Sequence, residues 1–272
     1  MAPPLCPWEQ IQLRAPGVSV LRPTVGPMAR NAIPGVGRPV RRMEARTGAE
    51  WEPRAWPWRI PAVTALLADG IDFGQATVLV GENGSGKSTI LESLAEAYGL
   101  NPEGGSTGAR FSTQRTESPL SDSVQLVRGA GASRGGYFLR AETMHGLFSY
   151  LATSGDSFHH LSHGESFRAI LEDRTRHRGR IRPGLYLLDE PESALSFTSS
   201  LHALATLVDL LSEPGVQIVM ATHSPMLSAL PGATILQLSD AGIEPRAWED
   251  LDLVVNERYF LADPQRFLRH LG

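Results

Sequence analysis

The chain has 272 residues, of which 42% are hydrophobic, and a formal net charge of −4 at pH 7. This length is enough to bury a sizeable core and is close to that of one large α/β domain, so we take one domain as the working assumption. Its apolar runs are far shorter than the roughly 20 residues of a membrane-spanning helix, and a single cysteine excludes an internal disulfide. The chain does not open on a secretory signal pattern, so we expect a cytoplasmic location.

The N-terminal segment 1–42 has a composition typical of disorder. It contains eight prolines, six arginines and one acidic residue, without a helical or alternating apolar pattern. A basic arm that touches nucleic acid is one alternative, and a translation start at Met28 or Met43 is another. We therefore assign the folded domain to residues 43–272, with order returning near Trp56.

After this segment, strand and helix patterns alternate. Apolar spacing predicts helices over residues 62–68, 88–98, 144–151, 165–177, 199–211 and 264–271. Short runs rich in β-formers predict strands over residues 77–80, 124–127, 137–139, 185–188, 216–220 and 234–238. Two of these strands, 124–127 and 137–139, flank a Gly-rich turn and are expected to pair as a hairpin. The remaining alternation predicts an α/β fold with a parallel sheet.

A glycine-rich motif with the pattern G-x-x-x-x-G-K-[ST] lies between a predicted strand and a predicted helix. Its residues are Gly81, Glu82, Asn83, Gly84, Ser85, Gly86, Lys87, Ser88 and Thr89. Such a loop turns successive backbone N–H groups toward phosphate oxygens at a helix N-terminus. Lys87 would reach the β- and γ-phosphates and Ser88 would bind Mg²⁺. The motif therefore predicts an ATP site with Mg²⁺.

The composition singles out the same motif. Lys87 is the only lysine in the chain, and the other 24 basic residues are arginines. An arginine-rich composition is also what a GC-rich genome produces. A chain that otherwise uses arginine nevertheless keeps its one lysine where a compact ammonium on a slim stem suits a phosphate.

A second candidate feature is the pair of carboxylates, Asp189 and Glu190, that ends the apolar strand 185–188. Two acids at the end of a buried strand are costly unless a cation lies beside them. We interpret Asp189 as the residue that holds Mg²⁺ through the water shell of the ion, and Glu190 as the general base that polarises the attacking water. A solvated strand end is the alternative.

Three further motifs follow the glycine-rich loop in an order that resembles the ABC ATPases. Leu161-Ser-His-Gly-Glu165 looks like their LSGGQ-type signature, and Asp189-Glu-Pro-Glu-Ser-Ala-Leu195 looks like their Walker B with the following D-loop. Ala221-Thr-His-Ser-Pro225 resembles the segment with their switch histidine. With the P-loop, the resemblance covers roughly residues 60–240.

The resemblance implies an active site made by two chains. Ser162, the Gly164 backbone and the helix beginning at Glu165 would bind the γ-phosphate held by the opposite subunit, so hydrolysis would require a homodimer. His223 would contact the γ-phosphate and the attacking water. With Lys87 and Glu190, it completes the expected catalytic set.

The sequence departs from the transporter pattern in places. Leu195 is followed by Ser196, whereas transporters usually have aspartate there. Gln114 lies about where the family has its metal-binding Q-loop glutamine, although its surroundings differ. Candidates for stacking on adenine are Trp58 and Phe73, and the alternative is that both belong to the core.

The residues within these motifs resemble those of stand-alone bacterial predicted ATPases and RecF/SMC-like proteins more closely than those of transporter subunits. The expected fold is an α/β P-loop NTPase with a mostly parallel sheet flanked by helices, an antiparallel β portion and a small helical insert at about 100–180 that carries the signature. The leading hypothesis is an ATP-hydrolysing switch that dimerises and acts on an unknown partner protein or on nucleic acid. The alternatives are the ATP-binding subunit of a membrane transporter, which reaches the membrane through a separate permease, and a non-hydrolysing regulatory module.

Overall fold

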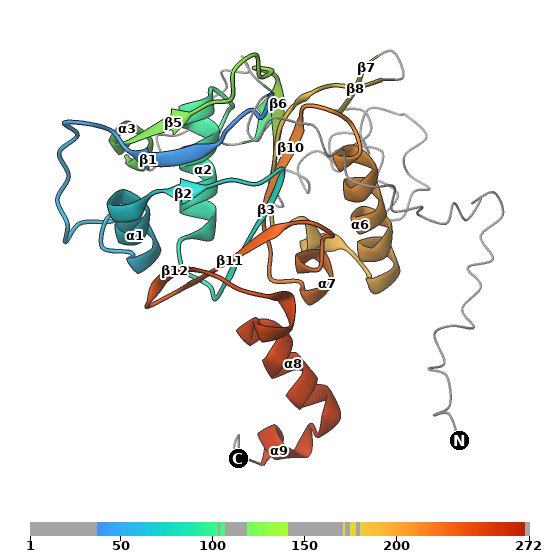
Figure 1. Ribbon diagram of the computed structural model, residues 1–272. Coiled ribbons are helices and arrows are strands. Elements are labelled where there is room, and N and C mark those ends of the chain that lie inside the picture. Colours follow the sequence, from blue (N-terminus) through green and yellow to red (C-terminus); the bar gives the residue numbers. More distant parts are fainter. Residues whose placement is uncertain are drawn as a thin grey trace, which may run out of the picture. The chain divides into compact units, whose positions relative to one another are not determined.

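The computed structural model describes residues 37–102, 104–106, 119–140, 171, 175–177 and 180–269 (Figure 1). The chain divides into two compact units, Met1–Ile33 and Pro34–Gly272, and every described residue lies in the second. The predicted helix 144–151 and most of the predicted helix 165–177 fall outside the described residues. Among the helices that are described, none has the length and apolar character needed to cross a membrane.

The centre of the second unit is a sheet of seven strands. They are β3 (Ala76–Gly81), β4 (Gly105–Ser106), β6 (Gly136–Arg140), β9 (Gly184–Asp189), β10 (Val216–Ala221), β11 (Thr234–Ser239) and β12 (Gly242–Pro245). Their order is β12-β11-β3-β10-β9-β6-β4, and the pairs from β11 to β6 are parallel. β12 and β4 add antiparallel edges. All six residues of β9 and of β10 are buried, as expected for central strands covered on both faces.

Smaller sheets supply the expected antiparallel portion. One is formed by β1 (Arg42–Ala45), β2 (Ile71–Asp72) and β5 (Val124–Val127), in the order β2-β1-β5. The other pairs β7 (Arg176–His177) with β8 (Arg180–Ile181). The fold is thus the mostly parallel, mixed sheet flanked by helices that the sequence predicts.

Helices cover both faces of the central sheet (Figure 1). Their bounds are α1 (Pro61–Asp69), α2 (Lys87–Tyr98), α3 (Leu120–Ser123), η3 (Pro191–Ala194), α6 (Phe197–Leu211), α7 (Pro225–Ser228), η4 (Trp248–Asp250), α8 (Asp252–Ala262) and α9 (Gln265–Leu268). One core joins α1, α2, β1 and β5 to alternate residues of the sheet, such as Leu187 and Val219. The other core joins α6, α7 and the start of α8 to the intervening residues, such as Leu188 and Met220. Two-residue alternation along each strand therefore produces the layers.

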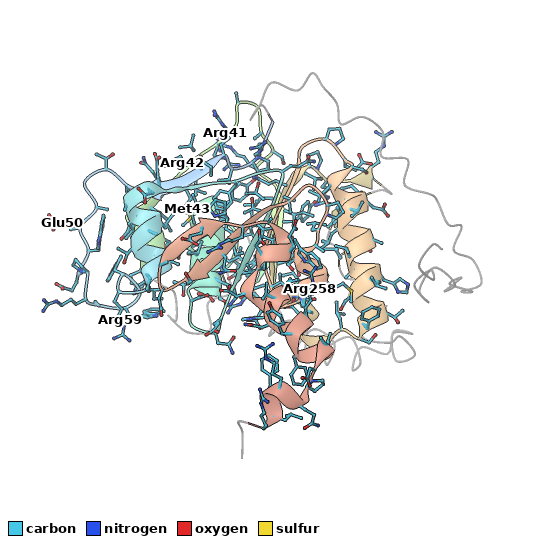
Figure 2. The ribbon with its side chains drawn as sticks, turned by 60° about the horizontal axis from the view of Figure 1, so that its bottom comes forward. Arg41, Arg42, Met43, Glu50, Arg59 and Arg258 are labelled. Carbon is cyan, nitrogen blue, oxygen red and sulfur yellow. The ribbon has the colours of Figure 1, made fainter. Side chains whose placement is uncertain are left out.

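The structure corrects the sequence analysis at two places. The predicted hairpin of 124–127 with 137–139 is wrong: β5 pairs with β1, and β6 pairs with β9 in the central sheet. Order also begins earlier than predicted, since Val40 is fully buried and β1 begins at Arg42, within the segment interpreted as disordered (Figure 2). The rest of that segment, 1–36, lies outside the described residues.

Gln217, a fully buried polar residue of β10, explains why the segment before β1 is held in place. Its side-chain oxygen accepts the Val40 N–H at 2.8 Å, and its amide nitrogen donates to the carbonyls of Val40 at 2.7 Å and Gly74 at 2.8 Å. One glutamine thus satisfies three backbone groups that have no ladder partner there. The contact spans 177 residues of sequence, so no local sequence pattern predicts it.

We predict that Gln217→Leu lowers the free energy of unfolding by about 3 kcal/mol, because it leaves buried backbone groups without partners. Chemical denaturation monitored by circular dichroism measures the change. Gln125→Leu is the matched control: its amide is exposed and bonds only Glu44 among the described residues, so the expected loss is under about 0.5 kcal/mol. A Gln217→Leu variant that unfolds at the same denaturant concentration as the parent would contradict this account.

Candidate functional site

The parallel strands bring the sequence-predicted residues to one edge of the sheet. β3 ends at Gly81, β9 ends at Asp189 and β10 ends at Ala221. The strands lie in register, with Ala221 opposite both Asp189 and Leu79. The P-loop, the two carboxylates and the segment with His223 therefore follow neighbouring strand ends, where ligands of open parallel sheets bind.

The P-loop adopts a backbone that requires glycine at two positions. Gly84 and Gly86 have φ angles of 82° and 99°, which lie in the left-handed region. A Cβ on Gly86 would also come within 2.9 Å of Ile60. Because Gly86 is the N-cap of α2, the loop leads directly into the positive end of that helix.

Lys87, the first residue of α2, turns its ammonium back into the loop. Its Nζ donates to the carbonyls of Gly81 at 2.8 Å and Glu82 at 3.0 Å. Burial lowers the pKa of this ammonium, and the carboxylates of Glu190, Asp189 and Glu192, in that order, partly oppose the shift. A phosphate in the loop would oppose it further, because added negative charge favours the protonated amine.

Ser88 and Asp189 form the candidate metal site. The Ser88 hydroxyl donates to Asp189 Oδ1 at 3.1 Å, across 101 residues of sequence. Asp189 is only 6% exposed, which is costly for a carboxylate unless a cation accompanies it. A hydroxyl and a carboxylate are hard oxygen donors of the kind Mg²⁺ prefers, so these residues fit the predicted ion.

Arg140, at the end of β6, is a site neighbour that sequence reasoning missed. It lies opposite Asp189 in the strand register, with its Nε 3.9 Å from Asp189 Oδ2. Its Nη2 lies 2.8 Å from Glu92 Oε1 on α2, and its Nη1 donates to the Pro102 carbonyl at 3.1 Å. The guanidinium thus links the P-loop helix to the carboxylate strand. The hairpin prediction had paired this strand with 124–127 and not with β9.

Glu190 and His223 face each other across the ends of β9 and β10. His223 Nε2 lies 3.4 Å from Glu190 Oε1. Glu190 has a φ angle of 47°, the one positive value of a non-glycine residue within the described ranges. Its N–H donates to the Ala221 carbonyl at 2.9 Å, which holds this strained backbone in place. The chain thus maintains an unfavourable conformation at the residue predicted to be the base.

A second missed residue, Glu192, contacts the same segment. Its Oε1 accepts the backbone N–H of His223 at 2.6 Å. Glu192 lies in the short helix η3, directly after the two carboxylates. Ser196, where the sequence departs from the transporter D-loop, caps α6 by accepting the Ser199 N–H. The departure therefore has a local structural role.

A cleft of about 490 Å³ opens at this edge of the sheet. Beside P-loop residues it is lined by Trp56, Arg59, Ile60, Pro61 and Glu190. Arg59 lies on the loop that leads into α1 (Figure 2). Neither expected stacking residue lines the cleft, since Phe73 is 2% exposed within the core and Trp58 packs against that core. The aromatic side chain at the cleft is Trp56, which is 51% exposed.

Other predicted site residues lie outside the part of the chain that the structure describes. These are Gln114, Ser162, Gly164 and Glu165. Their assigned roles stay predictions. The P-loop residues, Asp189, Glu190 and His223 are brought together as their positions at the strand ends require.

Comparison with known proteins gives matches to ATP-binding proteins. Residues 169–229 match the family model described as "AAA domain, putative AbiEii toxin, Type IV TA system". The chain is 28% identical to the ribose import ATP-binding protein RbsA 1 of Streptomyces avermitilis, over 60% of this chain and 35% of that protein. It is 29% identical to the arabinose import ATP-binding protein AraG of Ralstonia nicotianae, over 65% of this chain and 39% of that protein. It is also 29% identical to the cytochrome c biogenesis ATP-binding export protein CcmA of Rhodopseudomonas palustris, over 58% of this chain and 84% of that protein.

The chain is thus similar to ABC-type ATP-binding proteins, in line with the resemblance of its motifs. The matched family-model segment contains the two carboxylates, η3 and His223, which is the half of the site opposite the P-loop. The chain spans 35% and 39% of the length of the two sugar-import relatives. Its activity and partners are therefore proposals.

We predict that Arg140→Met lowers the free energy of unfolding by about 2 kcal/mol, because Glu92 and Asp189 would then lie in a largely buried region without this shared cation. Thermal and chemical denaturation measure the loss. Arg128→Met is the matched control: Arg128 also contacts α2, stacking over the Tyr98 ring at 4.3 Å, and its hydrogen bond goes to the Ser133 carbonyl and not to either acid. Equal losses in the two variants would show that stacking on the helix, and not the charge link, determines the effect.

Proposed function

We propose that the chain binds ATP together with Mg²⁺ and hydrolyses its terminal phosphoanhydride bond. The observation that carries the proposal is that a buried lysine, a hydroxyl–carboxylate pair and a strained glutamate lie at one edge of the sheet, beside a cleft lined by Lys87, Ser88 and Glu190. The similarity to ATP-binding proteins supports the same activity.

In this proposal the charge of each residue at the site determines which part of the nucleotide or metal it contacts. Lys87 exchanges its two carbonyl partners for phosphate oxygens, which relieves the unfavourable burial of its ammonium. Ser88 and Asp189 hold Mg²⁺, which neutralises phosphate charge when it is bound. The hydrogen bond from the Ser88 hydroxyl to Asp189 already brings together the two residues that would hold the ion.

The proposed chemistry uses Glu190 as the base and His223 as the group that contacts the terminal phosphate. The Glu190 carboxylate takes a proton from water as the water oxygen forms its bond to the γ-phosphorus. The bond from that phosphorus to the bridging oxygen breaks, and ADP leaves with the electron pair. The 3.4 Å contact between Glu190 and His223 places the two side chains close enough to act on the same water.

The finer proposal is a homodimer acting as a switch in the cytoplasm. It rests on the resemblance of residues 161–165 to the signature motif, which would bind the γ-phosphate of the opposite subunit. The partner of such a switch would be a protein or a nucleic acid. The match to a family model described as an AAA domain supports this stand-alone interpretation.

A second candidate is the ATP-binding subunit of a membrane transporter. The printed names of three relatives, which are import or export ATP-binding proteins, favour it. Purification of the chain from solubilised membranes together with a permease would support this candidate. A chain that forms ATP-dependent dimers without any membrane partner would support the switch instead.

We predict that Glu190→Gln binds ATP with the parent's affinity and lowers kcat by at least about 100-fold, because the base is lost while the phosphate cradle is kept. Fluorescent-nucleotide titration measures binding, phosphate release measures turnover, and light scattering after size exclusion measures a trapped dimer. Glu257→Gln, an exposed acid on α8, is the control and is expected to behave like the parent.

Normal turnover by Glu190→Gln would show that the Glu190 carboxylate is not the base. Background turnover by the parent itself, with nucleotide binding intact, would instead favour the non-hydrolysing regulatory module.

A further inference from the structure

We propose that Glu192 is the positioning residue that sets His223 for hydrolysis, by fixing the backbone of the segment that carries the histidine. The inference rests on the proposed function, since it assigns a role within the same site. It assigns a role to a half-buried carboxylate that neither the P-loop nor the metal pair requires.

The first observation is the contact itself. Glu192 Oε1 accepts the backbone N–H of His223 at 2.6 Å. The two residues are 31 positions apart and follow different strands, β9 and β10. The bond therefore ties together two loops that the sheet alone leaves independent.

The second observation is the state of the other carboxylate oxygen. Glu192 Oε2 is buried and, within the described residues, has no hydrogen-bond partner. A buried carboxylate oxygen without a partner is costly, so a side chain free to move would turn it toward water. That the side chain instead keeps its bond to His223 indicates that this contact determines its orientation.

The third observation is the placement of Glu192 relative to the chemistry. Glu192 follows Glu190 by two residues, and its charge contributes to the pKa of Lys87, so it lies near the site. Glu190 lines the cleft, whereas Glu192, like His223, is not among the described residues that line it. The contact that joins Glu192 to the base is its bond to His223, whose ring lies 3.4 Å from Glu190.

The local backbone explains why a carboxylate two residues after the base can reach the neighbouring loop. Glu190 takes a left-handed conformation, with a φ angle of 47°, and the chain turns there into η3. Its N–H donates to Ala221, while the side chain of Glu192 accepts from His223. The segment 221–223 is thus held at both ends by the turn after β9.

Holding the histidine by its backbone has a kinetic consequence. Displacement of a reacting group by about 1 Å lowers a rate by up to about 100-fold even when ground-state binding is unchanged. Loss of the Glu192 bond would let the N–H of the half-buried His223 turn toward water and move the ring away from Glu190. Nucleotide affinity, which depends on the P-loop, would change little.

The test compares Glu192→Ala with Glu192→Gln in the full chain. The alanine variant removes the acceptor, and we expect kcat to fall about 10- to 100-fold while the dissociation constant of a fluorescent ATP analogue stays within about twofold. The glutamine variant keeps a carbonyl acceptor of the same reach, and we expect its kcat within about threefold of the parent. Glu249→Ala, an exposed acid in the other short helix η4, is the matched control and is expected to leave kcat unchanged.

The deciding measurement is a double-mutant cycle with His223→Ala. If Glu192 acts through the histidine, adding Glu192→Ala to His223→Ala lowers kcat no further. Hydrogen exchange of the peptide that contains His223 gives a readout independent of turnover, and faster exchange is expected in Glu192→Ala alone.

Three results would overturn the inference while leaving the proposed function intact. They are parent-like turnover and exchange in Glu192→Ala, equal loss in the alanine and glutamine variants, and a full additional loss in the double variant. Absence of turnover in the parent chain would instead overturn the proposed function, and this inference with it.

Discussion

The rest of the site depends on the burial of the Lys87 ammonium among the P-loop carbonyls and the nearby carboxylates. A lysine at 4% exposure loses most of its hydration, and two P-loop carbonyls replace only part of it. The nearby carboxylates of Glu190, Asp189 and Glu192 favour its charged form, yet burial still lowers its pKa. The site thus combines the cationic side chains of Lys87, Arg59 and Arg140 with several carboxylates, and a nucleotide with its metal would bring the matching charges.

The parallel sheet makes this arrangement possible, because it ends β3, β9 and β10 at one edge. The P-loop follows the first strand, the acids follow the second and His223 follows the third. Cross-links between these loops then fix the geometry: Ser88 to Asp189, Glu190 to Ala221 and Glu192 to His223. Each loop is therefore positioned by a strand and by its neighbour.

The sequence predicted the features that depend on local pattern. The P-loop and the carboxylates of Asp189 and Glu190 were recognisable because residue type and order alone define them. The predicted strand 185–188 and helix 199–211 correspond to β9 and α6, since buried strands and amphipathic helices have their own periodicity.

Other features depend on contacts distant in sequence and could not be predicted. The Gly-rich turn after 124–127 resembles a hairpin turn, but β5 pairs with β1, whose position depends in part on the bonds between Val40 and Gln217. The role of Arg140 follows from β6 lying beside β9, and that of Glu192 from the turn at Glu190. Trp56 at the cleft was overlooked for a similar reason, since the sequence does not show which aromatic side chain faces the P-loop.

The central claim is that Lys87 and the carboxylate strand together hold a nucleotide with its metal. Isothermal titration calorimetry of the parent chain and of Lys87→Ala, each with ATP in the presence of Mg²⁺ and in its absence, tests this claim most directly. The account predicts saturable uptake by the parent that Mg²⁺ strengthens, and an affinity at least about 10-fold weaker in the variant, because the phosphates lose their counter-cation. No uptake by a folded parent chain, or equal affinity in the two proteins, would contradict it.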